Sequence, residues 1–137
     1  MDNTFDISSE AAADTAIIEL DRPNGDPMLN AKEEQCSVTV YGPGSKTFQR
    51  AQAARNRAVL AFVKKGGKKM ADDEQREIDA EFLATCTVSF NGFNYKNLTG
   101  HEQFKAAYMD TKIGFIAEKV NKGVGDWSNF TQSSVKN

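Results

Sequence analysis

The chain has 137 residues, 39% of them hydrophobic, and its nineteen acidic and seventeen basic side chains give a formal charge of −2. This length fits one domain that buries about two thirds of the unfolded surface, and the near balance of charge excludes a protein that binds nucleic acid through its overall charge. Two widely separated cysteines and one histidine are too few for a metal or redox site, so Cys36 and Cys86 are expected to be free, half-buried thiols.

Residues 1–13 are polar and acidic, with Phe5 and Ile7 as their only large apolar side chains. This composition predicts a flexible N-terminal arm and does not match a signal peptide. No apolar run approaches the roughly 20 residues of a membrane-spanning helix. We therefore expect a soluble, cytoplasmic protein that has no membrane partner.

Two segments near the N-terminus have the patterns of strands. Residues 15–20 are mostly apolar and end at a turn, 21–27, that holds two prolines and an Asn-Gly pair. Residues 35–41 alternate apolar and polar side chains, as a half-buried strand does. We expect the two segments to pair as an antiparallel hairpin.

The clearest signal is a long helix from Ser45 to Lys65, which begins with an N-cap serine and ends at Gly66-Gly67. At 100° per residue, its apolar side chains share one face and its cations the other. The apolar residues are Phe48, Ala51, Ala58, Val59 and Phe62, with Val63 at the edge, and the cations are Lys46, Arg50, Arg57 and Lys64. Arg55 breaks the separation because it falls within the apolar stripe.

Three further helices are expected, with boundaries set by acidic starts, a capping box and glycines. They run from Asp72 to about Val88, from Thr99 (with Glu102 completing the box) to Met109, and from about Ile113 to Gly123. The fold is therefore α+β but mostly α: a hairpin packed on about four helices, forming a single domain over 14–123. Its core is expected to contain Phe48, Val59, Phe62, Ile78, Phe82, Ile113, Ile116 and Val120.

No arrangement of residues indicates catalysis, so we expect no enzyme and no cofactor. His101 has no neighbouring acid or nucleophile in the sequence. The acidic cluster 72–74 fits a helix start better than a metal site, and Gly42-Pro43-Gly44 lacks the lysine spacing of a phosphate loop. The basic segment 64–69 is expected to be a solvated loop.

Two features suggest contact with another protein. Arg55 either extends to the edge of the core or pairs with a carboxylate of a partner. Residues 124–137 are expected to be a flexible tail, from which Trp127 and Phe130 dock on a neighbouring copy or on a partner. In the alternative, Trp127 closes its own core. The candidate partner-binding residues are Lys46, Arg50, Arg55, Arg57, Lys64, Trp127 and Phe130.

The order of these segments resembles the tail assembly chaperones of long-tailed bacteriophages over most of residues 15–130. The resemblance consists of the proline-glycine turn 23–28, a strand ending in glycine and serine at 38–45, the arginine-rich helix 50–57, the aromatic turn 89–93, and Asn129-Phe130. Such proteins often carry tryptophan where Phe90 stands, and the segment 100–110 lacks an expected proline.

The resemblance implies a mainly helical protein that coats the rod-like tape measure protein, keeps it soluble, and helps recruit tail tube subunits. It also implies self-association along the rod, a longer form made by translational frameshifting, and absence from the finished virion. A rod with exposed apolar and charged heptads requires a partner with apolar stripes and alternating charge. A small structural tail or tail-completion protein and a nucleic-acid-binding module that uses the basic helix face remain the alternatives, the latter disfavoured.

Overall fold

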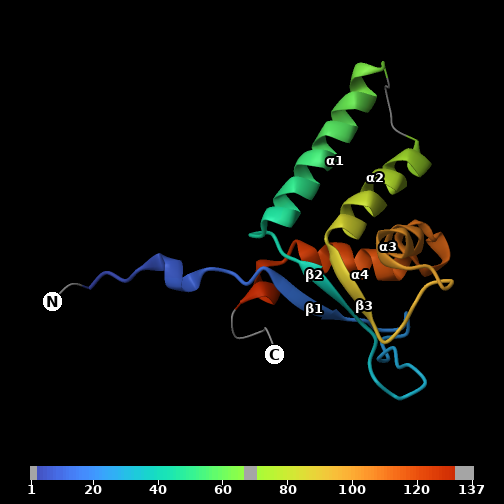
Figure 1. Ribbon diagram of the computed structural model, residues 1–137, viewed down its shortest axis with the longest axis horizontal. Coiled ribbons are helices and arrows are strands. Elements are labelled where there is room, and N and C mark those ends of the chain that lie inside the picture. The colour runs from blue at the N-terminus through green and yellow to red at the C-terminus, as the bar shows by residue number, and fades with distance from the viewer. Residues whose placement is uncertain (1–2, 67–70, 132–137) are drawn as a thin grey trace.

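The computed structural model describes residues 3–66 and 71–131, which form an α+β fold that is mostly helical (Figure 1). Three strands form one antiparallel sheet in the order β1-β2-β3. The strands are β1 (Thr15–Glu19), β2 (Ser37–Tyr41) and β3 (Thr87–Asn91), and the helices are α1 (Lys46–Lys64), α2 (Asp72–Thr85), α3 (Gly100–Met109) and α4 (Gly114–Val124). Short 3-10 turns cover Ile7–Glu10, Thr111–Ile113 and Trp127–Phe130.

The predicted hairpin between the first two segments is confirmed. In its register, Ile18 of β1 lies opposite Val38 of β2, and Ala16 lies opposite Val40. All four of these side chains are buried, whereas Ile17 and Glu19 on the opposite face of β1 are exposed. The period-2 pattern therefore gives a sheet with one face against the helices and one face toward solvent.

The third strand was missed, because the sequence predicted a helix that continues to about Val88. Helix α2 ends at Thr85 instead, and β3 pairs with β2, with Phe90 opposite Val38. No glycine or proline separates α2 from β3, so the sequence holds no breaker at this junction. The β-branched pair Thr87-Val88 was the available signal for a strand.

The long helix has the predicted ends. The Ser45 hydroxyl accepts a hydrogen bond from the Phe48 N–H at 3.1 Å and donates one to the Gly42 carbonyl at 2.8 Å. The helix ends at Lys64, and Gly66 has a φ of +84°. Helix α3 also starts after Thr99, as predicted, but without the capping-box hydrogen bond. Gly100 instead begins that helix with a φ of +61°.

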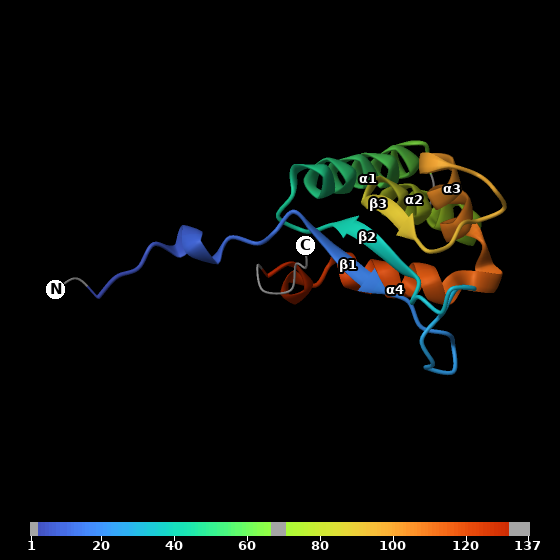
Figure 2. The same ribbon diagram turned by 60° about the horizontal axis from the view of Figure 1, so that its bottom comes forward.

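The core lies between the sheet and helices α2, α3 and α4 (Figure 2). Of the predicted core residues, Phe82, Ile116 and Val120 are buried, and Phe48 and Ile113 pack against them. Val59, Phe62 and Ile78 are only partly buried and lie outside this core. The reason is that α1 and α2 run side by side away from the sheet, so their far halves contact each other but not the core (Figure 1).

The C-terminal residues belong to the domain. Phe130 is 0% exposed, and its ring lies against Gly42, where an added Cβ would come within 2.4 Å of the ring. The Phe130 carbonyl accepts a 2.6 Å hydrogen bond from the Ala13 N–H. The expectation of a tail that begins at 124 is therefore wrong for residues 124–131, and residues 132–137 lie outside the described part of the chain.

The N-terminal segment leaves the body of the domain. Residues 3–10 extend away from the sheet in both views (Figures 1 and 2), and the side chains of Phe5 and Ile7 are exposed. Asp6 caps the turn Ile7–Glu10 by accepting a hydrogen bond from the Ser8 N–H at 3.0 Å. Residues 3–10 of the predicted arm are thus separate from the sheet, whereas Ala12 packs against the core and the Ala13 N–H bonds to the Phe130 carbonyl. The flexibility of the arm stays a prediction.

Candidate functional site

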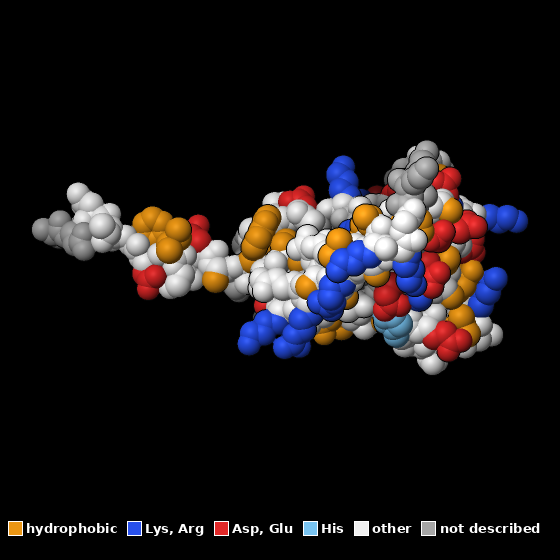
Figure 3. Space-filling view, turned by 90° about the horizontal axis from the view of Figure 1, so that it is seen from above, with side chains coloured by type: hydrophobic (Ala, Val, Ile, Leu, Met, Phe, Trp, Pro, Cys, Tyr) orange, Lys and Arg blue, Asp and Glu red, His pale blue; other side chains and the backbone are white. Residues whose placement is uncertain are grey.

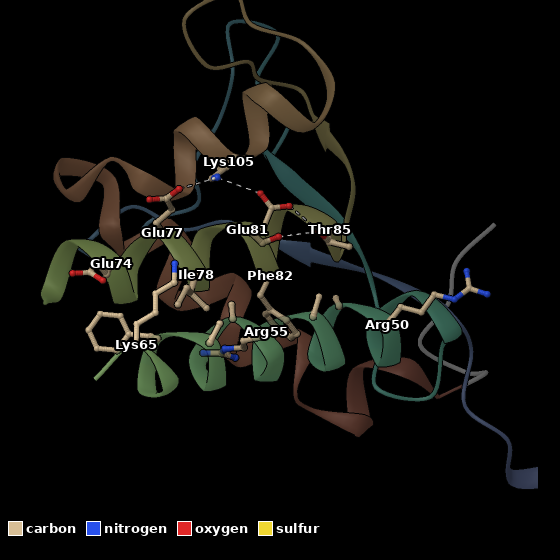
Figure 4. A pocket seen from close by; sticks show the side chains of 15 residues that line it. Arg50, Arg55, Lys65, Glu74, Glu77, Ile78, Glu81, Phe82, Thr85 and Lys105 are labelled. Carbon is tan, nitrogen blue, oxygen red and sulfur yellow. Dashed lines mark hydrogen bonds and ion pairs between the residues drawn. The ribbon is translucent and has the colours of Figure 1, made fainter. Parts of the chain in front are cut away.

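A groove of about 730 Å³ opens on the surface between α1 and α2 and is here called the α1–α2 groove (Figure 4). Its floor is apolar, with Phe62 from α1 and with Ile78 and Phe82 from α2. Phe62 and Ile78 were predicted for the core and lie outside it, whereas Phe82 belongs to the core. Helices α1 and α2 project from the sheet, and the groove between them leaves apolar surface accessible to a partner.

Small side chains form the α1 wall of the groove. Ala51, Ala54, Ala58 and Ala61 line it, and all but Ala51 are exposed. Their positions, i, i+3, i+7 and i+10, place them in one row along the helix. Ala51 and Ala58 were predicted for the apolar stripe, whereas Ala54 and Ala61, which extend that stripe into the groove, were not. The spacing of three, four and three residues was the signal that could have shown the whole row.

Acidic side chains form the α2 side of the groove, from Glu74, Glu77 and Glu81. Lys105 of α3 lies between two of them, with its Nζ 3.6 Å from Glu77 Oε1 and 3.3 Å from Glu81 Oε1. Of the three, only Glu74 was predicted to have a role, as an acid at the helix start. Their i, i+3, i+7 spacing was the signal that places them on one face of α2.

Glu81 also holds the only histidine, His101, whose Nε2 lies 2.9 Å from Glu81 Oε2. Partial burial opposes ionisation of the Glu81 carboxyl, but His101 and Lys105 outweigh this effect and hold its pKa below the usual value. This pair is half exposed and connects α2 to α3. It therefore orders one edge of the groove.

Arg55 links the two helices within the chain. Its guanidinium forms an ion pair with Asp79 of α2, and its Cζ lies 4.8 Å from the centre of the Phe82 ring. Of the two interpretations of Arg55, the structure supports the one that keeps it at the edge of its own fold, because Asp79 supplies the carboxylate. Arg55 is thus a residue that fixes α1 on α2 rather than one left open for a partner.

The other predicted cations of α1 lie together on its outer side. Lys46, Arg50, Arg57 and Lys64 are all exposed, and Lys and Arg side chains follow one another in a row across the molecule in Figure 3, with acidic side chains to one side. Arg50 also reaches the end of the α1–α2 groove. The predicted basic segment at 68–69 lies outside the described residues.

Trp127 and Phe130 are separated by the structure. Trp127 is 59% exposed and lies near Gly44, whereas Phe130 is enclosed in the core. Asp126 starts this turn by accepting a hydrogen bond from the Ser128 N–H at 3.0 Å. Phe130 is therefore not accessible to a partner and is removed from the candidate residues, while docking by Trp127 stays a prediction. The alternative prediction was that Trp127 closes the core of its own domain, but Phe130 occupies that place instead.

The buried titratable groups have structural environments. Burial raises the pKa of the Cys86 thiol to about 12. Burial also raises the pKa of the Tyr108 hydroxyl, which lies 2.6 Å from the Thr87 hydroxyl. Both cysteines are free and buried. Within the part of the chain that the structure describes, no group of three or more His, Cys, Asp or Glu side chains could hold a metal ion.

Comparisons with known protein families, curated proteins and solved structures find no match to this chain. Among the described helices, none has the length and apolar composition of a membrane span. What the site offers chemically is an apolar groove between an acidic side and a basic side. Such a surface can bind a helix or an extended segment of another protein.

Proposed function

We propose that this protein is a tail assembly chaperone of a long-tailed bacteriophage, which binds the tape measure protein and keeps it soluble. The observation that carries the proposal is that helices α1 and α2 project from the sheet and present an apolar groove with charged sides. A domain that only needed to fold would gain by closing this groove over Phe62 and Ile78. A protein that binds a helical rod uses an open groove of this kind.

The same proposal includes how the protein acts in the host cytoplasm. Several copies bind along the rod through α1 and α2, associate with one another, and help bring tail tube subunits to it. The chaperone then leaves before the virion is complete. Leu60 and Val63, which are 52% and 55% exposed on α1, add apolar contact area for these associations.

The test is co-expression with a tape measure protein, the long coiled-coil rod that is the proposed partner. We expect the coiled-coil protein to be soluble and to co-purify only when this chain is present. The double variant Arg50→Glu and Arg57→Glu should capture less of it, because a charge reversal on an exposed face weakens association while changing stability by about 0.5 kcal/mol or less per site.

A matched control makes the same change in net charge at two positions outside α1. The variant Lys32→Glu with Lys112→Glu reverses two exposed cations, one in the loop between β1 and β2 and one in the turn before α4. This control should have the melting temperature of the wild type and should capture as much of the coiled-coil protein. The proposal fails if the coiled-coil protein is equally insoluble with and without this chain.

Two other outcomes would identify the alternatives. A nucleic-acid-binding module would bind a DNA duplex with an affinity that falls by decades between low and moderate salt. A structural tail protein would be present in purified particles. The basic row of α1 supports the first of these alternatives, but the acidic side of the groove opposes it because carboxylates repel phosphates.

A further inference from the structure

The α1–α2 groove has the geometry of a coiled-coil face from which one helix is absent. The row from Ala51 to Ala61 has the spacing of a and d positions in a heptad. Alanine side chains allow two helix axes to approach to about 8 Å. The residues on the α1 side of the groove run from Arg50 to Lys65, a rise of about 22 Å at 1.5 Å per residue, so the wall is long enough for roughly four turns of a second helix.

The charges on the two sides of the groove differ in sign. On the α1 side, Arg50 and Lys65 stand at the two ends of the alanine row. On the α2 side, Glu77 and Glu81 pair with the ammonium group of Lys105, the half-exposed imidazole of His101 contacts Glu81 on the same edge, and Glu74 lies farther along the helix. At the end near the helix connection, Lys65 and Glu74 lie on opposite sides (Figure 4). An occupant of the groove therefore meets a cation at each end of the α1 side and carboxylates along the α2 side, two of which are paired with Lys105.

We infer that the α1–α2 groove seats a single amphipathic helix of the partner, with a narrow apolar seam against the alanine row. Its flank beside α1 carries Asp or Glu, and its flank beside α2 carries Lys or Arg. The inference rests on the proposed function, and it adds the chemistry of the bound segment. The two flanks also fix the direction of the bound helix, because reversing it would place like charges together.

A second copy of this chain is a poorer occupant. The exposed arm offers Phe5 and Ile7, but residues 1–13 contain acids and no Lys or Arg. Such a segment complements the α1 side only and is repelled by Glu74 and its neighbours on α2. A helix with mixed flanks satisfies both sides of the groove.

The direct test uses three synthetic 21-residue helices that share a leucine seam and differ in their flanks. One has glutamate on one flank and lysine on the other, one has glutamate on both, and one has lysine on both. Fluorescence anisotropy of the labelled peptides at about 0.1 M salt should show the mixed peptide binding about tenfold more tightly than either control, a difference of about 1.4 kcal/mol. Equal affinities for the three peptides would overturn the inference.

Two variants locate the binding site. Ala58→Arg places a long charged side chain on the groove wall, and Ala53→Arg places the same side chain on another face of the same helix, at a position that is also exposed and does not line the groove. The first should weaken binding of the mixed peptide about tenfold, and the second should leave it unchanged. Ala61→Arg serves in place of Ala58→Arg if circular dichroism shows a loss of helix. Equal binding by the wall variant and the control would overturn the inference.

A third variant tests the charges. Glu74→Lys makes the end of the groove basic on both sides, so the preference should shift from the mixed peptide toward the all-glutamate peptide. An unchanged preference would contradict the assignment of the flanks.

The inference and the proposed function can fail separately. If Ala58→Arg still keeps the coiled-coil protein soluble in co-expression, the groove is not the binding site, although the proposed function stands. If the mixed peptide binds in the groove but the coiled-coil protein stays insoluble, the groove seats a helix and the proposed function fails.

Discussion

Replacing Phe130 by alanine tests whether the C-terminal segment belongs to the core. The side chain is 0% exposed, and its ring contacts Gly42 across the chain. Truncation of a buried phenylalanine removes its transfer free energy and leaves a cavity, which together cost about 3–5 kcal/mol. A chain of this size has an unfolding entropy of about 0.3 kcal/mol/K, so the melting temperature should fall by about 10–17 °C.

The assay is thermal and denaturant unfolding followed by circular dichroism, with Trp127→Ala as the comparison. Trp127 is larger but mostly exposed, so its removal should cost about 0.5 kcal/mol or less. Truncation after Lys122 should also destabilise the domain, because it removes Val124 and Phe130 from the core. The reasoning is refuted if Phe130→Ala melts within about 2 °C of the wild type, since the segment would then not be docked.

Three further predictions concern the groove, its edge and the thiols. Phe62→Ala should cost about 1 kcal/mol because the ring is only partly buried in the groove, whereas Phe82→Ala should cost about 3–5 kcal/mol; equal denaturant midpoints for the two variants would contradict this. The Glu81 carboxyl has a lowered pKa in the fold, so its stabilising contribution is present above the pKa of the unfolded chain, about 4.3, and is lost as the pH falls through the folded pKa. Glu81→Gln should therefore cost up to about 1 kcal/mol at pH 7, and this cost should shrink as the pH falls through the folded pKa; a cost that is independent of pH would show that the ion pairs contribute nothing. In a Cys36→Ala variant, the Cys86 thiol, with a pKa of about 12, should react with a disulfide reagent at pH 8 only when denaturant unfolds the chain; rapid reaction without denaturant would show that this thiol is accessible.

The local patterns of the sequence predicted the first half of the fold well. The alternation at residues 36–41 and the Ser45 cap are properties of adjacent residues, so they can be read without knowledge of the tertiary structure. The strand β3 could not be read in this way. Its pairing with β2 decides its conformation, and the residues before it continue the helical pattern of α2 without a breaker.

The candidate site was predicted only in part, because some of its features follow from local patterns and others from tertiary contacts. The cations of α1 are exposed as expected, because helical periodicity alone sets their face. The groove depends on how α1 leans on α2, which is fixed by the contacts of Arg55 with Asp79 and Phe82. The burial of Phe130 depends on Gly42, about ninety residues earlier in the chain, and no local pattern around 124–130 records that contact.

The contact between Phe130 and Gly42 also has a consequence for synthesis on the ribosome. Strand β2 and helix α1 emerge from the exit tunnel well before residue 130 does, and at about 5–20 residues per second the delay is several seconds. During that time the space beside Gly42 is unfilled, and the apolar side chains of β1 and β2 lack part of their cover. A nascent chain of this protein therefore completes its domain only when Phe130 is free to reach the sheet, a late, long-range step of the kind that slows folding.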